Sequence, residues 1–304
     1  MDLSIVVCSY NRYALAAQSA LAIENSSSFD PETMELIVVE NTPPARRQKL
    51  ALGPHARVVL CDEPGLSNAR NAGIAAATGE IIAFVDDDAV VHDEWCSAVV
   101  AAFKDHPQAQ VCGGRTAPRF SGNAFPDWYY DDLAYYLSCI DWGPQSHVLQ
   151  PGQWIVGANM AFRTTVFDSI GYFDPALGRK GEGSLLSNEE IAMLRKVGRE
   201  KVFYIHDMVV DHIISDERVS LGWFRKRVFW QAVSDVLSGE VHKELAQSAE
   251  ELFNIVARAP AEHRGHRLLS YEPTSPEGLK DQLEAVYAMA TLMSAGMPAL
   301  SLKG

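Results

Sequence analysis

The first 115 residues alternate short apolar runs with segments of helical spacing. Residues 3–8 form an apolar, β-branched run that fits a buried strand, and residues 13–23 follow with Ala- and Leu-rich helical spacing. The same alternation predicts strands at 35–40, 57–61, 80–85 and 111–115, and helices at 65–77 and 93–103. Such alternation predicts an α/β fold with a mostly parallel sheet and helices on both faces.

The rest of the chain changes character twice. Residues 118–151 are rich in Trp, Tyr, Asp and Pro without a clean period, which predicts long ordered loops around short helices. After them we expect a strand at 154–163, helices at 165–170 and 188–197, and closing strands at 201–205 and 208–211. Beyond His212 the pattern becomes amphipathic and predicts helices at 221–237, 241–256 and 276–294.

Composition and charge exclude several classes of protein. The 26 basic and 39 acidic residues give a net charge of −13, which argues against nucleic acid as a partner because phosphate backbones bind basic surfaces. With no signal-peptide pattern and no window of about 18 uninterrupted apolar residues, we expect a cytoplasmic chain without a membrane span. The cysteines form no CxxC pair, which predicts reduced thiols and no zinc site; they are Cys8, Cys61, Cys96, Cys112 and Cys139.

Three consecutive carboxylates, Asp86, Asp87 and Asp88, follow the strand expected at 80–85. Adjacent like charges repel each other, and a hard cation such as Mg²⁺ or Mn²⁺ would neutralise them and bridge the phosphates of a nucleotide. The alternative is a solvated loop whose aspartates cap the next helix. Their place at the carboxyl end of a strand, where open α/β sheets bind ligands, favours the metal.

A second polar group, Ser9, Tyr10, Asn11 and Arg12, directly follows the first strand. The first β-to-α turn of such a sheet commonly faces a nucleotide, although Ser and Asn are also ordinary turn and cap residues. No GxGxxG and no Walker A sequence follows any expected strand, which argues against dinucleotide oxidoreductases and P-loop enzymes.

These motifs, in this order, resemble those of the family 2 inverting glycosyltransferases, which have the GT-A fold. Residues 4–12 are similar to the family's first strand and its Pro-Thr-Tyr-Asn-Arg turn, with Cys8-Ser9 in place of Pro-Thr. Residues 37–41 resemble the second strand with its terminal acid, and residues 65–73 with 78–80 match the family closely. The three aspartates fall on the family's DxD element. The resemblance covers roughly two-thirds of the chain.

The resemblance implies a GT-A domain at 1–214, with a nucleotide-binding half at 1–115 and an acceptor and catalytic half at 116–214, and then a helical C-terminal extension at 215–304. It implies that Glu40 contacts the base, that Asp86 contacts the ribose and that Asp88 binds the metal. The other residues that it assigns to the nucleotide sugar are Ser9, Tyr10, Asn11, Arg12, Asn68, Arg70, Asp87, Gly157 and Asn159. For Arg70, an ordinary ion pair on a helix surface remains an alternative.

The resemblance also places the catalytic base and a further metal ligand. Glu190, with Glu189 as the second choice, falls where the family carries the base that accepts the proton of the acceptor hydroxyl. Because Ser187 and Glu190 also fit a capping box, Glu190 remains open to a structural role. His212 falls where the family can complete the metal shell, with Asp86 and Asp88, and an imidazole ligand favours Mn²⁺ over Mg²⁺. A plain core histidine is the alternative.

Residues 223–230 form an aromatic and basic segment in an otherwise acidic protein. It could lie peripherally on the inner face of an anionic membrane or cover the acceptor cleft, but we prefer an amphipathic helix packed on the domain. The aromatic residues before it suit either sugar stacking or a core; they are Trp128, Tyr129, Tyr130, Trp142 and Trp154.

The sequence thus predicts a metal-dependent inverting glycosyltransferase. The expected donor is a nucleoside diphosphate sugar, with a UDP-sugar favoured, and the expected acceptor is a saccharide or a lipid-linked saccharide. A sugar-1-phosphate nucleotidyltransferase is a rival, although residues 9–12 lack its Gly-rich basic loop. A catalytically silent protein that binds glycans or nucleotide sugars is another rival, which the carboxylates retained at 86–88 and 189–190 disfavour.

Overall fold

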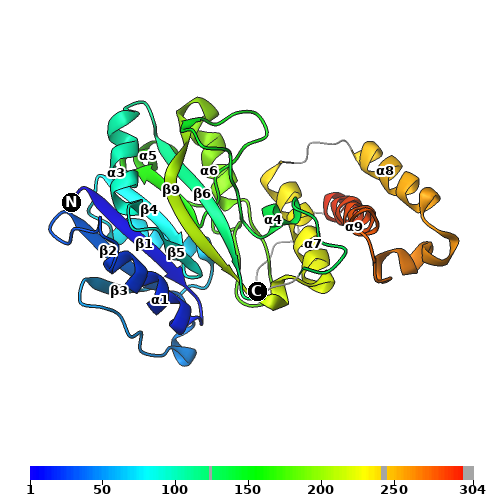
Figure 1. Cartoon of the computed structure of the whole chain (residues 1–304), viewed down its shortest axis with the longest axis horizontal. Coiled ribbons are helices and arrows are strands. Elements are labelled where there is room, and N and C mark those ends of the chain that lie inside the picture. Colours follow the sequence, from blue (N-terminus) through cyan, green and yellow to red (C-terminus); the bar gives the residue numbers. More distant parts are fainter. Residues whose placement is uncertain (123–124, 241–244, 297–304) are drawn as a thin grey trace.

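The computed structural model describes residues 1–122, 125–240 and 245–296, which form an α/β sheet domain and a group of C-terminal helices (Figure 1). The first elements alternate in the order β1 (Leu3–Ser9), α1 (Tyr13–Glu24), β2 (Met34–Glu40), β3 (Ala56–Leu60), α2 (Leu66–Ala76), β4 (Ile81–Asp86), β5 (Ala89–Val91), α3 (Trp95–Asp105) and β6 (Val111–Phe120). The next elements are α4 (Leu133–Tyr136), β7 (His147–Val148), β8 (Asn159–Arg163), α5 (Thr165–Ile170), α6 (Glu189–Val197) and β9 (Val202–Ile214). Helices α7 (Leu221–Ser238), α8 (Leu245–Arg258) and α9 (Pro276–Gly296) follow.

In the described part of the chain, the strands form a nine-stranded sheet in the order β3-β2-β1-β4-β8-β6-β9-β5, with β7 paired to β9. Strand β1 is parallel to β2 and β4, and β2 is parallel to β3, whereas β8 runs antiparallel between β4 and β6. The predicted α/β fold is confirmed. Because parallel strands end at the same edge, the residues that follow β1, β2 and β4 share one side of the sheet.

The central strands are buried on both faces, which explains why their sequences are continuous apolar runs. From β1, Leu3, Ile5 and Val7 pack into a cluster with residues of α1 and α3. Val6 points to the opposite face, where its cluster includes residues of α2, α5 and α6. The period of two along a strand therefore divides the core into two layers, and the helices hold the sheet from both sides.

Several elements differ from the expectation. The strand expected at 154–163 begins only at Asn159, because the segment before it turns and Asn159 N donates to the Val156 carbonyl at 3.1 Å. The closing strands expected at 201–205 and 208–211 are one strand, β9, whose register with β6 shifts between Gly114 and Thr116. Strand β5 was not predicted, since three residues are too short for a periodic signal.

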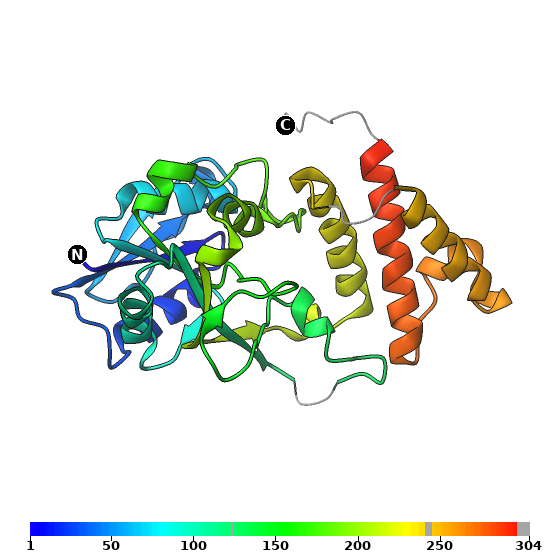
Figure 2. The same ribbon diagram turned by 90° about the horizontal axis from the view of Figure 1, so that it is seen from above.

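The C-terminal helices form the end of the molecule opposite the N-terminus (Figures 1 and 2). Helix α7 buries Phe224 and Val228 against Leu137, beside α4, and against Leu279 and Leu283 of α9. This packing confirms a helical C-terminal part and shows residues 223–230 as an amphipathic helix on the domain. Of the helix expected at 241–256, residues 241–244 lie outside the described residues. No helix in the described ranges has the length and apolar character needed to cross a membrane.

Asn159 lies between strands and has a fully buried side chain. Its amide oxygen accepts a hydrogen bond from Trp95 Nε1 at 2.9 Å, and its amide nitrogen donates to the carbonyls of Arg115 and Met208 at 3.0 and 2.7 Å. All of these contacts are internal, so the side chain ties α3, β6 and β9 together.

We expect Asn159→Leu to destabilise the fold by about 3–5 kcal/mol, because it leaves the buried Trp95 N–H and Met208 carbonyl, and the partly buried Arg115 carbonyl, without this partner. Urea denaturation followed by circular dichroism measures this change. The matched control is Asn254→Leu, at an exposed position of α8, for which we expect a change of about 0.5 kcal/mol or less. An equal effect of the two substitutions would contradict this structural role of Asn159.

Candidate active site

The three aspartates lie at the carboxyl end of β4, where the sheet edge faces the C-terminal half of the chain. Asp86 is the last residue of β4 and keeps 31% of its side chain exposed, whereas Asp87 and Asp88 are buried in the turn to β5. The turn is anchored because Ile213 N donates to the Asp88 carbonyl at 2.8 Å. None of the three aspartates caps α3, whose N-cap is Glu94, so the helix-capping alternative is wrong.

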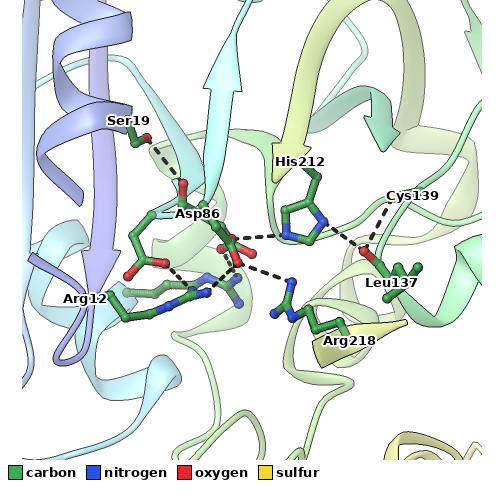
Figure 3. A network of polar contacts seen from close by, with 10 residues as sticks. Arg12, Ser19, Asp86, Leu137, Cys139, His212 and Arg218 are labelled. Atoms are coloured by element: carbon green, nitrogen blue, oxygen red, sulfur yellow. Dashed lines mark hydrogen bonds and ion pairs between the residues drawn. The ribbon is translucent and has the colours of Figure 1, made fainter. Parts of the chain in front are cut away.

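Arginines from distant parts of the chain neutralise these carboxylates (Figure 3). Arg12 forms ion pairs with both Asp87 and Asp88, through Nη1 at 2.6 Å and Nη2 at 2.9 Å. Arg218 Nη1 lies 3.3 Å from Asp88 Oδ2. Burial and the charge of Asp88 raise the pKa of Asp87 to about 7 in spite of Arg12. Burial also acts to raise the pKa of Asp88, but His212, Arg218 and Arg12 hold it well below its usual value.

Asp86, Asp88 and His212 can hold a metal ion, because one ligand atom from each lies within 4.8 Å of the others. His212 Nδ1 lies 2.8 Å from the Leu137 carbonyl, which can only accept, so this nitrogen carries a proton (Figure 3). Nε2 lies 3.0 Å from Asp88 Oδ1; it donates there when the ring is protonated, and it offers a lone pair when the ring is neutral, which is the form that binds a metal. A lone pair on Nε2 and the carboxylate oxygen of Asp88 could both bind the same cation. Metal-binding histidines usually donate their other ring nitrogen to a group such as a backbone carbonyl, as Nδ1 does here.

Arg70 of α2 is a fully buried cation. Its Nη1 bonds Glu189 at 2.6 Å, its Nη2 lies 3.6 Å from Asp86, and its guanidinium lies over the rings of Phe84 and Phe173. Burial alone would lower the pKa of Arg70, but the charges of Glu189 and Asp86 outweigh it and raise the pKa. Arg70 is therefore an internal ion that pairs two acidic segments, and the surface ion-pair alternative is wrong.

The adjacent glutamates of α6 have different surroundings. Glu189 is paired with Arg70, whereas burial and the charge of Glu189 raise the pKa of Glu190 to about 8. Asn188, in the left-handed conformation with φ 72°, is the N-cap residue, and no side chain caps the helix. Glu190 is thus the second helical residue instead of the third, and the capping-box alternative does not describe this helix.

A cavity of about 450 Å³ adjoins the carboxylates, and a larger one of about 1010 Å³ lies between the domain and helices α7 and α9. Of the predicted residues, the smaller cavity is lined by Tyr10, Asn11, Arg12, Arg70, Asp86, Asp87, Asp88, Gly157, Glu189 and Glu190. Glu190 and Arg227 line both cavities. The carboxylate with the raised pKa therefore lies at the boundary between the two spaces.

Other predicted residues do not line the smaller cavity. Ser9 and Glu40 are buried, and Glu40 accepts from Thr42 N at 2.7 Å while its Oε2 has no hydrogen-bond partner in the described part of the chain. Asn68 donates to the Pro64 carbonyl at 3.3 Å, and Asn159 makes the internal contacts described above. These four residues do not line either cavity.

Sequence analysis missed Arg179, Arg218 and Arg227. Arg179 and Arg227 line the smaller cavity, and Arg218 reaches Asp88 from the segment after β9. Arg227 belongs to the basic segment 223–230, for which a position over the acceptor cleft was one of the alternatives, whereas Arg179 and Arg218 lay in no predicted motif. Asn41 was quoted only within a motif, yet its amide holds the loop before α2 through Cys61, Glu63 and Gly65.

The pocket of carboxylates and arginines lies at the carboxyl edge of an α/β sheet, which is where open α/β sheets bind their ligands. The family model described as Glycosyl transferase family 2 matches residues 4–166, and the chain belongs to this family. It is a glycosyltransferase, and the predicted resemblance is confirmed.

Named relatives and solved structures resemble the chain over most of its length. The glucosyl-dolichyl phosphate glucuronosyltransferase of Haloferax volcanii is 27% identical over 241 residues, 77% of this chain and 76% of the relative. The succinoglycan biosynthesis protein ExoM of Rhizobium meliloti is 26% identical over 278 residues, 83% of this chain and 78% of the relative. The structure of S. aureus TarS residues 1–349 has a TM-score of 0.47 and 15% identity, and the match covers 96% of this chain and 90% of that solved chain.

Removing the charge of Arg70 should destabilise the fold by about 3–5 kcal/mol, because Arg70→Met leaves Glu189 buried without its partner. Arg70→Met combined with Glu189→Gln should recover at least half of that loss, since the one carboxylate then left without Arg70, Asp86, is partly exposed to water. The free energies of unfolding come from urea denaturation of the wild type, both single variants and the double variant.

Arg119→Met, at an exposed position of β6, is the matched control and should change stability by about 0.5 kcal/mol or less. If the effects of Arg70→Met and Glu189→Gln simply add, the pair does not act as a coupled ion pair.

Proposed function

We propose that the protein is a metal-dependent inverting glycosyltransferase that moves a sugar from a nucleoside diphosphate sugar to a hydroxyl of a saccharide or lipid-linked saccharide. The observation that carries the proposal is the position of Glu190, which lines the carboxylate cavity and the larger cavity beside it. Inversion needs a base between donor and acceptor, on the side of the anomeric carbon opposite the leaving diphosphate. The raised pKa of Glu190 suits that role.

On the donor side, the cationic residues of the smaller cavity bind the diphosphate. Arg12 and Arg179 line it with directional N–H donors that match phosphate oxygens. Asp86, Asp88 and His212 are the residues that would hold Mn²⁺ or Mg²⁺, and a bound ion would stabilise the charge that develops on the leaving diphosphate. We keep a UDP-sugar as the favoured donor from the family resemblance, although Glu40, which the resemblance assigns to the base, is buried and does not line the cavity.

Glu190, and not Glu189, is the base in this proposal. Glu189 is held by Arg70 at 2.6 Å, so its carboxylate is already engaged with a buried cation. Glu190 takes the proton of the acceptor hydroxyl while the hydroxyl oxygen bonds to the anomeric carbon. The bond from that carbon to the diphosphate breaks at the same time, and its electron pair leaves with the diphosphate.

The acceptor class rests on the relatives and on the larger cavity. One relative is named for acting on a sugar linked to dolichyl phosphate, and another for the biosynthesis of a polysaccharide. We extend both classes to this chain as the acceptor, a saccharide that is free or lipid-linked. A cytoplasmic location, with contact to the inner membrane face, belongs to the same proposal. The alternative to an active transferase is a catalytically silent protein that binds glycans or nucleotide sugars. The experiment below distinguishes the two.

With Mn²⁺, the wild type should release nucleoside diphosphate from one member of a panel of UDP-, GDP- and dTDP-sugars. Asp88→Asn and Glu190→Gln should each lose about 100-fold or more of that rate, through loss of the ion and of the base respectively. Glu190→Gln should still bind the nucleotide in calorimetry with Mn²⁺, and chelation should abolish turnover in the wild type.

Glu250→Gln is the matched control on an exposed position of α8 and should retain the full rate. Absence of both donor turnover and metal-dependent nucleotide binding in the wild type would favour the silent binding protein.

The transfer rate should depend on the protonation of Glu190. The base acts only as a carboxylate, so kcat/KM should rise about tenfold per pH unit until the pH reaches about 8 and then level off. Glu189→Gln removes the neighbouring negative charge that raises this pKa, so its acid limb should move to lower pH. Rate measurements at saturating metal across the pH range test both statements; an unmoved or higher acid limb in Glu189→Gln would contradict them.

A further inference from the structure

The lining of the smaller cavity contains more arginine than its ion pairs use. Its acidic residues are Asp86, Asp87, Asp88, Glu182, Glu189 and Glu190, and its basic residues are Arg12, Arg70, Arg179 and Arg227. Arg12 and Arg70 each pair with two of these acids, and Glu182 pairs with an arginine outside the lining. In the part of the chain that the structure describes, Arg179 and Arg227 form no ion pair with a carboxylate.

The guanidinium of Arg227 contacts uncharged side chains instead. Its Nη2 donates to Gln231 Oε1 at 2.7 Å and lies 3.5 Å from Ser187 Oγ. Its Nη1 is buried and has no hydrogen-bond partner within the described ranges. Asp235, further along α7, accepts hydrogen bonds from three neutral side chains and does not pair with Arg227. One N–H group of a buried cation therefore remains unsatisfied, which is costly unless a ligand bonds to it.

The missing counter-charge does not come from the neighbouring base. Burial and the charge of Arg179 lower the pKa of Arg227 to about 10, so the guanidinium keeps its proton at neutral pH. Glu190 has a pKa raised to about 8 and is mostly protonated at that pH, and its Oε2 also has no hydrogen-bond partner among the described residues. Arg227 is thus a buried cation without an anion.

The position of Arg227 shows which part of a substrate it can reach. Arg227 and Glu190 both line the smaller cavity, where the donor binds in the proposed transfer. The base of an inverting transfer lies across the anomeric carbon from the leaving diphosphate. A cation beside Glu190 therefore faces the sugar and not the diphosphate. Arg179, whose charge acts on Arg227, lines the smaller cavity but not the larger one, so an anion close to both arginines lies on the donor side.

We propose that Arg227 binds a carboxylate of the transferred sugar, so that the donor is a nucleoside diphosphate uronic acid. A planar guanidinium matches a carboxylate with parallel N–H donors, and the unpartnered Nη1 supplies one of them. A neutral hexose carries a hydroxymethyl group in place of the carboxylate and would leave the buried charge without an anion. This inference rests on the proposed glycosyl transfer and names the class of sugar that is transferred.

Calorimetry in the presence of Mn²⁺ tests the inference without turnover. The donors form matched pairs of UDP-glucuronate with UDP-glucose, UDP-galacturonate with UDP-galactose, and GDP-mannuronate with GDP-mannose, and UDP and GDP are the references. In at least one pair, the wild type should bind the uronate about tenfold or more tightly than the hexose, as expected for a hydrogen bond between charged groups.

Arg227→Met should abolish this preference, because it removes the cation and its N–H donors. Its affinity for UDP or GDP should stay within about threefold of the wild type, which also shows that the variant is folded. Arg227→Lys keeps the charge without the planar donors and should retain part of the preference. Lys226→Met is the matched control, at an exposed position of α7 that lines neither cavity, and should retain the whole preference.

The binding data and the donor assay separate this inference from the proposed function. Equal binding, or no binding, of both members of every pair by the wild type would overturn the inference. A preference that survives Arg227→Met would also overturn it, and so would an equal loss of UDP, hexose and uronate binding, which would place Arg227 on the diphosphate. Turnover of hexose donors alone would contradict the inference and leave glycosyl transfer intact. A uronate preference that depends on Arg227, without turnover of any donor, would support the carboxylate site and count against glycosyl transfer.

Discussion

The buried guanidinium of Arg70 is the contact on which the active site depends. A cation without water must be paired, and Arg70 finds Glu189 at 2.6 Å and Asp86 at 3.6 Å, so α2 fixes both the end of β4 and the start of α6. The Phe84 and Phe173 rings hold its plane. Gly157 is required beside it, since a β-carbon there would collide with the guanidinium. Segments far apart in sequence are thereby held around one ion.

The Arg70 guanidinium also makes the adjacent residues Glu189 and Glu190 differ in their ionisation. Arg70 holds the charge of Glu189, and that charge together with burial raises the pKa of Glu190 to about 8. Because the folded protein then binds a proton that the unfolded chain releases near pH 4.5, Glu190 lowers the free energy of unfolding as the pH rises from about 4.5 to 8. At neutral pH the buried Glu190 is thus mostly protonated, and this raised pKa comes at the expense of stability, as is common at catalytic sites.

The fold could be predicted from the sequence wherever a local pattern of residues determines the structure. Strands such as β1 and β4 are buried on both faces and therefore appear as continuous apolar runs, and the acids that follow them lie at one sheet edge by topology alone. Local patterns could not distinguish Asn159, a buried bridge between strands, from an asparagine that faces a cavity. They also could not place Arg218 and Arg227, because tertiary packing after β9 brings these side chains to the site.

Helix α7 connects the wall of the larger cavity to the start of α6, which carries Glu190. Asn188, which begins α6, has φ 72°, a backbone conformation that needs support from its surroundings. That support comes from α7: the Asn188 amide donates to Asp235 at 2.7 Å and to Ser238 at 3.1 Å, and accepts from Gln231 at 3.0 Å. One turn before Gln231, the same helix carries Arg227 into the space beside Glu190. The helix that lines the larger cavity therefore also holds the N-cap residue of α6, so the C-terminal part supports the helix that carries Glu190.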